Sequence, residues 1–195
     1  MGLFPAGKGP FFTPGTRGFM ANDDILKFCP RCAAPARLAD SRKIVCGGCG
    51  LTLYLNTAAA VAALIFDPDG RLMAVRRSRD PKKGLLDLPG GFVDFGESAE
   101  GALARELSEE LGVEVEGGSL GYFRSIPNIY EYKGVLYHTL DLFFTCRLPA
   151  GPATAIRPND EIMEITYRFP NEIDEGEIAF DSMKALVRWM RERGG

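Results

Sequence analysis

Residues Gly91 to Val113 read GFVDFGESAEGALARELSEELGV, and this stretch decides the fold around it. From Ser98 to Leu111 the pattern predicts a helix, because Ser98 can cap the N-terminus and Gly112 can adopt the backbone conformation that ends a helix. Leucine recurs at every fourth position, so one stripe of this helix is expected to face a core. The stripe comprises Leu103, Leu107 and Leu111.

Three glutamates lie on one face of this predicted helix. Glu106, Glu109 and Glu110 are spaced i, i+3 and i+4, which places their carboxylates on adjacent turns. Their repulsion costs roughly a few tenths of a kcal/mol per pair on an exposed helix. One interpretation is a solvated acidic face. The other is a site for Mg²⁺ or Mn²⁺, because these cations prefer several oxygen ligands and would remove the repulsion.

The loop before the helix bears on that choice. Leu88 to Gly91 reads LPGG, and its glycines let the backbone approach a ligand or a metal closely. Glu97 stands at the helix entrance, and Arg105 directly precedes Glu106. An ion pair between Arg105 and Glu97 would fix the loop against the helix. This context favours the cation site over the solvated face.

The spacing of these residues resembles the Nudix box, which runs Gly, five residues, Glu, seven residues, then Arg-Glu-apolar-x-Glu-Glu-x-Gly-apolar. Every specified position is filled, and the resemblance extends from about residue 58 to residue 193. It implies an α/β fold, a Nudix α/β/α sandwich on a mixed sheet. It also implies a hydrolase that cleaves the diphosphate bond of a nucleoside diphosphate linked to another moiety. The matching residues are Gly91, Glu97, Arg105, Glu106, Leu107, Glu109, Glu110, Gly112 and Val113.

The same resemblance implies roles for single residues. A divalent metal, Mg²⁺ or Mn²⁺, would screen the phosphates and activate a water molecule. One of the last two glutamates, Glu109 or Glu110, would orient or deprotonate that water. The implied metal ligands are Gly91 through its carbonyl, Glu106, Glu109 and Glu110, and the implied orienting pair is Arg105 with Glu97.

Two further regions are candidates for substrate contact. Glu161 lies just before the segment ITYRF, where the family often places another carboxylate, and we favour it over Glu164. Arg76 begins a basic stretch ahead of LPGG, and we select it as a residue that holds substrate phosphate. A surface turn and a solvated charged loop are the alternatives. The basic residues of the stretch are Arg76, Arg77, Arg79, Lys82 and Lys83.

Strand-like and helix-like patterns alternate through the rest of this region. The apolar run at residues 58–66 predicts a buried central strand. The turn DPDG leads from it into a second strand at 71–77, which we expect to complete a hairpin. Strands with two helices in this order indicate an α/β/α layered domain on a mixed sheet. The remaining expected elements are strands at 122–129 and 135–146, a loop at 149–158 and a helix at 181–193.

Four of the five cysteines form a separate pattern near the N-terminus. Cys29 and Cys32 make one CxxC turn, Cys46 and Cys49 make a second, and the two are 13 residues apart. Four thiolates brought together this way are typical of a closed structural Zn²⁺ site. Two disulfides or a redox pair are the alternatives. Because so small a segment cannot hold a fold by apolar burial alone, we predict a zinc ribbon.

Three parts follow from these patterns. Residues 1–27 are expected to be a flexible leader, with Met1 or Met20 as the start of translation. Residues 28–55 would be the zinc ribbon, and residues 56–195 the hydrolase domain. A ribbon ahead of such a domain resembles the NADH diphosphatase branch of the family, in which the ribbon is associated with dimer formation. A homodimer is therefore one expectation.

One signature of that branch is incomplete. The branch carries SQPWPFPxS downstream of the box, whereas residues 125–130 here read SIPNIY, with only the Ser and the Pro kept. NADH, NAD⁺ and ADP-ribose all remain candidate substrates. Nearby aromatic residues could stack a nucleobase or simply pack against one another. These are Tyr122, Phe123, Tyr130, Tyr132 and Tyr137.

Bulk properties narrow the alternatives. The net charge of −3, from 23 basic and 26 acidic residues, disfavours bulk nucleic-acid binding. No apolar run approaches the roughly 18 residues of a membrane helix, so no membrane span is expected. Without an export signal, and with CxxC cysteines, the expected compartment is the cytoplasm. Two other functions stay open, namely a nucleotide-sensing regulator without turnover and removal of a nucleotide cap from RNA.

Overall fold

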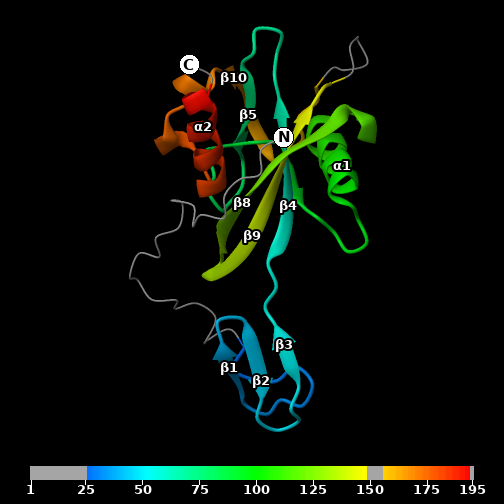
Figure 1. Cartoon of the computed structure of the whole chain (residues 1–195), viewed down its shortest axis with the longest axis vertical. Helices are drawn as coiled ribbons and strands as arrows, with labels where there is room; N and C mark the ends of the chain where they lie inside the picture. The colour runs from blue at the N-terminus through cyan, green and yellow to red at the C-terminus, as the bar shows by residue number, and fades with distance from the viewer. Residues whose placement is uncertain (1–25, 149–155, 194–195) are drawn as a thin grey trace. The chain divides into compact units, whose positions relative to one another are not determined.

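The computed structural model describes residues 26–148 and 156–193, which form two compact units that divide between Tyr54 and Leu55 (Figure 1). Residues 1–25 of the predicted leader and 149–155 of the predicted loop lie outside the described residues. In the part of the chain that is described, no helix is long and apolar enough to cross a membrane.

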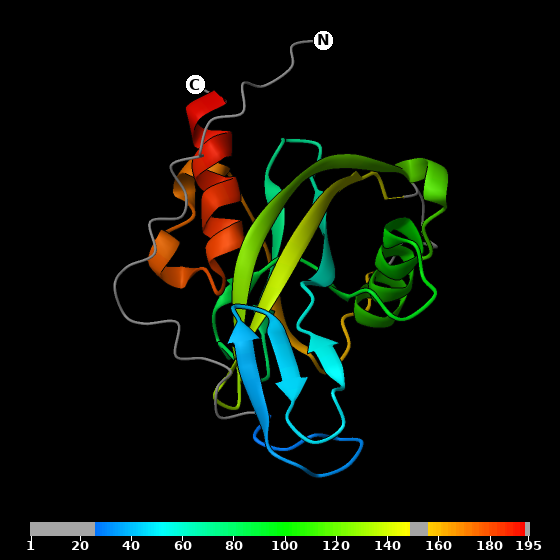
Figure 2. The same ribbon diagram turned by 60° about the horizontal axis from the view of Figure 1, so that its bottom comes forward.

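The first unit is a three-stranded antiparallel sheet in the order β1-β2-β3 (Figure 2). Its strands are β1 (Ala36–Asp40), β2 (Lys43–Cys46) and β3 (Thr52–Tyr54). Among the described residues of this unit, only Cys29, Ile44 and Cys46 have buried apolar side chains. Such a core is too small to stabilise the sheet without another contribution.

A four-stranded mixed sheet is the centre of the second unit, in the order β7-β4-β9-β8. Strand β4 is parallel to β9, while β7 and β8 are antiparallel to their neighbours. Both edges of β4 are therefore occupied, as expected for a strand whose apolar sequence predicts a central position. The strands are β4 (Ala58–Ile65), β7 (Gly90–Phe92), β8 (Leu120–Tyr132) and β9 (Val135–Cys146).

A second sheet of this unit corrects one prediction. Strand β5 (Leu72–Arg77) does not form a hairpin with β4; it pairs with β10 (Ile162–Arg168) and β6 (Leu86–Asp87). Only an isolated bridge between Phe66 and Leu72 joins the two strands at the turn. Because β7 and β9 already use both edges of β4, the chain turns a corner and starts a new sheet.

Two helices cover the sheets from opposite sides (Figure 1). Helix α1 (Ala99–Leu111) contributes its leucine stripe to one core with Val61, and α2 (Asp181–Arg193) contributes to a second core with Leu64 and Leu72. Both helices match the predicted segments, and the predicted α/β/α layering on a mixed sheet is confirmed. Among the described residues of this unit, short 3₁₀ turns lie at Gly117–Ser119, Pro170–Glu172 and Glu175–Glu177.

Candidate active site

Caps at both ends fix the position of helix α1. The Ser98 hydroxyl accepts a hydrogen bond from the Gly101 N–H at 3.1 Å, and Gly112 ends the helix with φ of 66°. The leucines of the helix are fully buried. Since the apolar stripe is anchored in the core, Glu106 and Glu110 are held on the side that faces the LPGG loop.

Arg105 ties the loop to the helix. Its Nε and Nη2 donate to the two carboxylate oxygens of Glu97 at 2.9 and 3.0 Å, and Nη2 also donates to the Phe92 carbonyl at 3.0 Å. Nη1 donates to Glu106 at 2.9 Å and to Glu109 at 3.2 Å. The Arg105 guanidinium lowers the pKa of Glu97, and the Asp94 N–H adds to that effect. The predicted pair is thus formed, in a bidentate geometry that fixes both partners.

The two glycines of the loop lie against the helix carboxylates. Gly90 donates its N–H to Glu110 Oε2 at 2.9 Å, with φ of 144°. A Cβ at Gly91 would lie 2.4 Å from Glu106 Oε1, and one at Gly90 would lie 2.1 Å from the Val61 carbonyl oxygen. A larger residue at Gly90 would clash with the β4 backbone, and one at Gly91 would displace the Glu106 carboxylate from its position.

These groups line a cavity of about 330 Å³ in the second unit. Glu106 and Glu110 reach it, and Glu161 joins them from the segment before β10. Glu109 does not line it; its side chain is 58% exposed and contacts Arg105 instead. Of the four carboxylates predicted to act on the metal or the substrate, three therefore converge on one space, and Glu109 lies outside it.

Burial raises the pKa of Glu110 to about 8, and the nearby charges of Glu106, Asp87 and Glu161 act in the same direction. Burial also raises the pKa of Glu106, against the opposing effect of Arg105. Negative charge is thus costly in this cavity without a counter-ion. Carboxylate oxygens crowded in this way form a donor set that suits a hard divalent cation.

Of the basic stretch at residues 76–83, the cavity is lined by Arg77 and not by Arg76, the predicted phosphate-binding residue. Arg76 does not line the cavity; it donates to Glu164 at 2.9 Å and to the Gly84 carbonyl at 2.7 Å. Adjacent residues of a strand point to opposite faces, so Arg77 points away from the side taken by Arg76, and it lines the cavity. Arg77 pairs with Asp87 at 2.9 Å, and burial raises the pKa of Asp87 to about 6.

A polar cluster in the same cavity was not predicted. Asp141 accepts hydrogen bonds from the Thr139 hydroxyl at 2.7 Å and from the Ser182 hydroxyl at 2.5 Å. Asn128 lies across from Thr139 on the neighbouring strand. Alternation along β9 could have placed Thr139 and Asp141 on one face. The sequence offered no signal that α2 would bring Ser182 to them.

The aromatic residues mainly pack against one another. Tyr130 stacks on Phe180 at 5.4 Å between ring centroids, and Phe92 meets Tyr130 edge-on, also at 5.4 Å. All three line the cavity. Tyr122 and Phe123 instead contact Phe144 and Trp189, so packing accounts for them.

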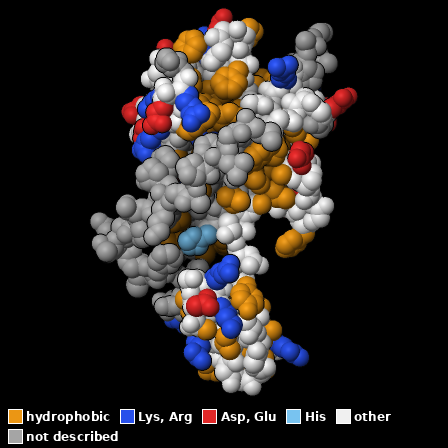
Figure 3. Space-filling model, in the orientation of Figure 1, with side chains coloured by type: hydrophobic (Ala, Val, Ile, Leu, Met, Phe, Trp, Pro, Cys, Tyr) orange, Lys and Arg blue, Asp and Glu red, His pale blue; other side chains and the backbone are white. Residues whose placement is uncertain are grey.

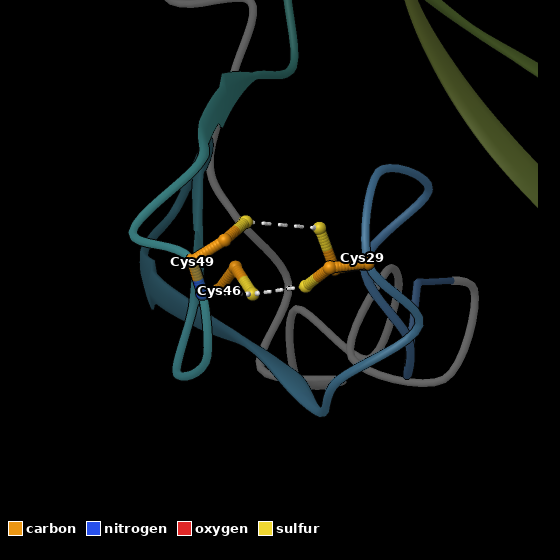
Figure 4. A group of neighbouring side chains, drawn as sticks. Cys29, Cys46 and Cys49 are labelled. Carbon is orange, nitrogen blue, oxygen red and sulfur yellow. Dashed lines mark hydrogen bonds between the residues drawn. The ribbon is translucent and has the colours of Figure 1, made fainter.

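In the first unit, the four CxxC cysteines form one cluster (Figure 4). Cys29 Sγ lies 3.8 Å from Cys49 Sγ, and Cys32 Sγ lies 3.5 Å from Cys46 Sγ. All four sulfur atoms lie within 4.8 Å of one another, so the group can hold a metal ion. Backbone N–H groups of Cys49 and Gly48 donate to the Cys46 thiol and lower its pKa to about 6.

A family model and curated relatives identify the class of enzyme as a Nudix diphosphatase, and a solved structure shares the fold. The model of the NUDIX domain matches residues 56–190, so the chain belongs to the Nudix hydrolase family. The crystal structure of a NUDIX hydrolase from Nitrosomonas europaea is similar with a TM-score of 0.59 and 22% identity, covering 87% of this chain and 93% of that one.

Two curated relatives carry activities in their names. The ADP-ribose pyrophosphatase of Methanocaldococcus jannaschii is 32% identical over 143 residues, which cover 73% of this chain and 79% of that protein. The NAD-capped RNA hydrolase NudC of Deinococcus radiodurans is 31% identical over 129 residues, which cover 64% of this chain and 43% of that protein.

Proposed function

We propose that this Nudix enzyme hydrolyses the diphosphate bond of a nucleoside diphosphate linked to another moiety, such as NADH, NAD⁺ or ADP-ribose, in a reaction that depends on Mg²⁺ or Mn²⁺. The observation that carries the proposal is the convergence of Glu106, Glu110 and Glu161 on one cavity beside the Gly91 backbone. The names of the two curated relatives support a substrate in which ADP is joined to a second group.

The carboxylates and the Gly91 carbonyl would hold the divalent cation. When bound, it would neutralise phosphate charge and lower the pKa of a water molecule. Arg105 keeps Glu106 in place through its hydrogen bond and keeps the loop in place through Glu97. Glu109 also contacts Arg105, but it lies outside the cavity, so we rank its contribution below those of Glu106 and Glu110.

Two residues at the cavity wall would act on the substrate. Arg77 is held in place by Asp87 and by the Pro81 carbonyl, and it can interact with a phosphate oxygen. Glu161 reaches the cavity while its Oε1 accepts from Arg79 at 2.7 Å. A carboxylate fixed in this way can orient a water molecule toward phosphorus.

The ion of the four-cysteine cluster is proposed to be structural Zn²⁺. Four soft thiolates in a closed set match its preferred ligands and leave no open coordination position. The small core of this unit agrees with a fold that depends on a metal.

Incubating the purified protein with ADP-ribose, NAD⁺ or NADH and Mg²⁺, and separating the products by chromatography, tests the proposal. We expect AMP from at least one of the three, and no AMP in the absence of a divalent metal. Failure to release AMP from any of them with Mg²⁺ or Mn²⁺ would contradict the proposal.

The ribbon favours a second candidate substrate, NAD-capped RNA. Residues 26–54 contain five basic side chains and one acidic one, although the whole chain is acidic. Several basic side chains lie on the face of the unit shown in Figure 3, and Phe28 and Tyr54 are exposed. Positive charge together with exposed aromatic side chains suits the binding of single-stranded nucleic acid. A kcat/KM for NAD-capped RNA that exceeds the value for free NAD⁺, and that falls in the Arg37→Ala variant, would support this candidate. Equal kcat/KM values for the two substrates in the wild type would exclude it.

A further inference from the structure

Part of the cavity is lined by polar side chains that have no role in the proposed metal site. The described residues include three buried polar side chains, and all three line this cavity. Asn128 is 6% exposed, Thr139 3% and Ser182 2%. Burying polar groups is unfavourable unless hydrogen bonds compensate, so their gathering in one place indicates a binding surface.

The carboxylate of Asp141 is fixed within this group. Each of its two oxygens accepts one hydroxyl hydrogen bond, from Thr139 and from Ser182. A carboxylate has about four acceptor positions, so about two remain for a ligand. Because both neighbours donate, Asp141 presents a fixed pair of acceptors to the cavity.

Asn128 adds an acceptor that has no partner. Its Oδ1 is the one buried side-chain oxygen or nitrogen in residues 26–148 and 156–193 without a hydrogen bond. Buried polar atoms are nearly always paired, so an exception beside a cavity needs an explanation. A donor on a bound ligand supplies one.

Strand register separates this group from the proposed metal site. Gly91 pairs with Val61 on β4, whereas Asp141 pairs with Ala60 from the other side of that strand. With neighbouring strands about 5 Å apart, Gly91 and Asp141 are separated by about 10 Å. Ala60 and Ala62 lie between them and leave the space open. A substrate with its diphosphate beside Gly91 would extend its nucleoside toward Asp141.

We infer that Asn128 and Asp141 recognise the exocyclic amino group of adenine. The amino group has two protons, and the two side chains offer one acceptor each. The Asn128 amide nitrogen can then donate to the adjacent ring nitrogen, a pairing that asparagine commonly makes with adenine. Hypoxanthine carries an oxygen at that position, which Asp141 would repel. The aromatic rings of Phe92 and Tyr130 line the cavity and would lie beside the bound adenine.

This inference rests on the proposed function and selects the adenine nucleotides within it. The test compares kcat/KM for ADP-ribose with that for its hypoxanthine analogue, and the Kd of AMP with that of IMP by calorimetry. In the wild type we expect adenine to be favoured by about 10- to 100-fold in both measurements. Asp141→Asn and Asn128→Ala should each reduce that ratio to within about threefold. Glu164→Gln removes a carboxylate that lies outside the cavity and should leave the ratio unchanged.

Each outcome has one meaning. If the wild type handles both purines equally, the inference is wrong, even if both are hydrolysed and the proposed function stands. If AMP binds more tightly than IMP but neither ADP-ribose nor NAD⁺ nor NADH is hydrolysed, the inference stands and the proposed function fails. Because the wild-type ratio needs no variant, an Asp141 variant that does not fold leaves the test intact.

Discussion

The first unit, which we call the ribbon, and the hydrolase unit each gather candidate metal ligands, but the two units support these ligands in opposite ways. In the ribbon, four sulfur atoms lie within 4.8 Å of one another, and among its described residues only Ile44 joins Cys29 and Cys46 in the buried apolar core. In the hydrolase unit, Glu106 and Glu110 stand on a helix whose leucines are fully buried.

The difference separates two uses of a metal. Under the proposed assignment, the unit with little apolar core needs its metal in order to fold, and its cysteine ligands are structural. A unit with two cores folds first and holds its ligands at a fixed distance from one another, even though their charges repel. The pKa of Glu110, raised by burial to about 8, reflects that repulsion together with the loss of solvent. Removing a ligand should therefore unfold the first unit and inactivate the second.

The largest effect is expected for Glu110→Gln. It should lower kcat by at least about 100-fold, because it removes a ligand charge and leaves the Gly90 contact possible. The thermal midpoint measured without added Mg²⁺ should stay the same or rise. Glu100→Gln, on the same helix but outside the cavity, is the matched control and should keep full activity. An unchanged kcat for Glu110→Gln would remove this residue from the site.

Cys46→Ser should break the ribbon and spare the hydrolase unit. Elemental analysis should find about one zinc per chain in the wild type and a large loss in the variant. Cys146→Ser changes the one cysteine outside the cluster and should retain the metal. If the Cys46 variant keeps its zinc, the four-thiolate assignment is wrong.

Arg105→Lys should have an intermediate effect. Lysine keeps the charge but cannot bond both oxygens of Glu97 and reach Glu106 at the same time. We expect kcat to fall by about tenfold or more, with a lower thermal midpoint. Arg188→Lys is a suitable control, since Arg188 bonds Glu175 in a similar way far along the chain from the site. Equal effects of the two substitutions would show that Arg105 acts on stability alone.

The smallest effect is a pH dependence of stability. Since Glu110 has a pKa above its usual value in the folded state, its stabilising effect is complete at low pH and is lost as pH rises toward about 8. Asp87, whose pKa is raised to about 6, likewise lowers the stability as pH rises toward about 6. Glu97 has a lowered pKa, so above about pH 5 it is ionised in both the folded and the unfolded state and does not contribute to the pH dependence of stability.

Without added Mg²⁺, the thermal midpoint should therefore fall by roughly 5 °C between pH 5 and pH 8. Saturating Mg²⁺ should reverse the fall. Chelators are avoided, because they would also remove a metal from the ribbon. In Glu110→Gln the slope should be much smaller; the same slope as in the wild type would contradict the assignment.

Sequence alone predicted both α-helices and strands β4, β5, β8 and β9, because caps and apolar periodicity act locally, but it did not predict β10 or the shorter strands. Ser98, Gly112 and the leucine stripe were sufficient for α1. The predicted hairpin of β4 and β5 was wrong, because a turn such as DPDG shows where the chain reverses and not which strand edges are still free. Edge occupancy depends on β7 and β9, which are distant in sequence.

The same limit applies to the site. The spacing along the sequence predicted that Glu106 and Glu110 lie beside the LPGG loop, because both residues stand on one helix and the loop leads into that helix. Sequence could not decide between Arg76 and Arg77, because alternation says that they face opposite sides without saying which side is the cavity. Asp141 and Ser182 meet only through the packing of α2, 41 residues apart.

A crystal of the enzyme soaked with Mn²⁺ and a non-hydrolysable ADP-ribose analogue tests the central claim most directly, because anomalous scattering locates the ion. We expect a peak in the cavity within about 2.5 Å of oxygens from Glu106 and Glu110 and of the bound diphosphate. A bound analogue with no ion between it and these two side chains would contradict the account.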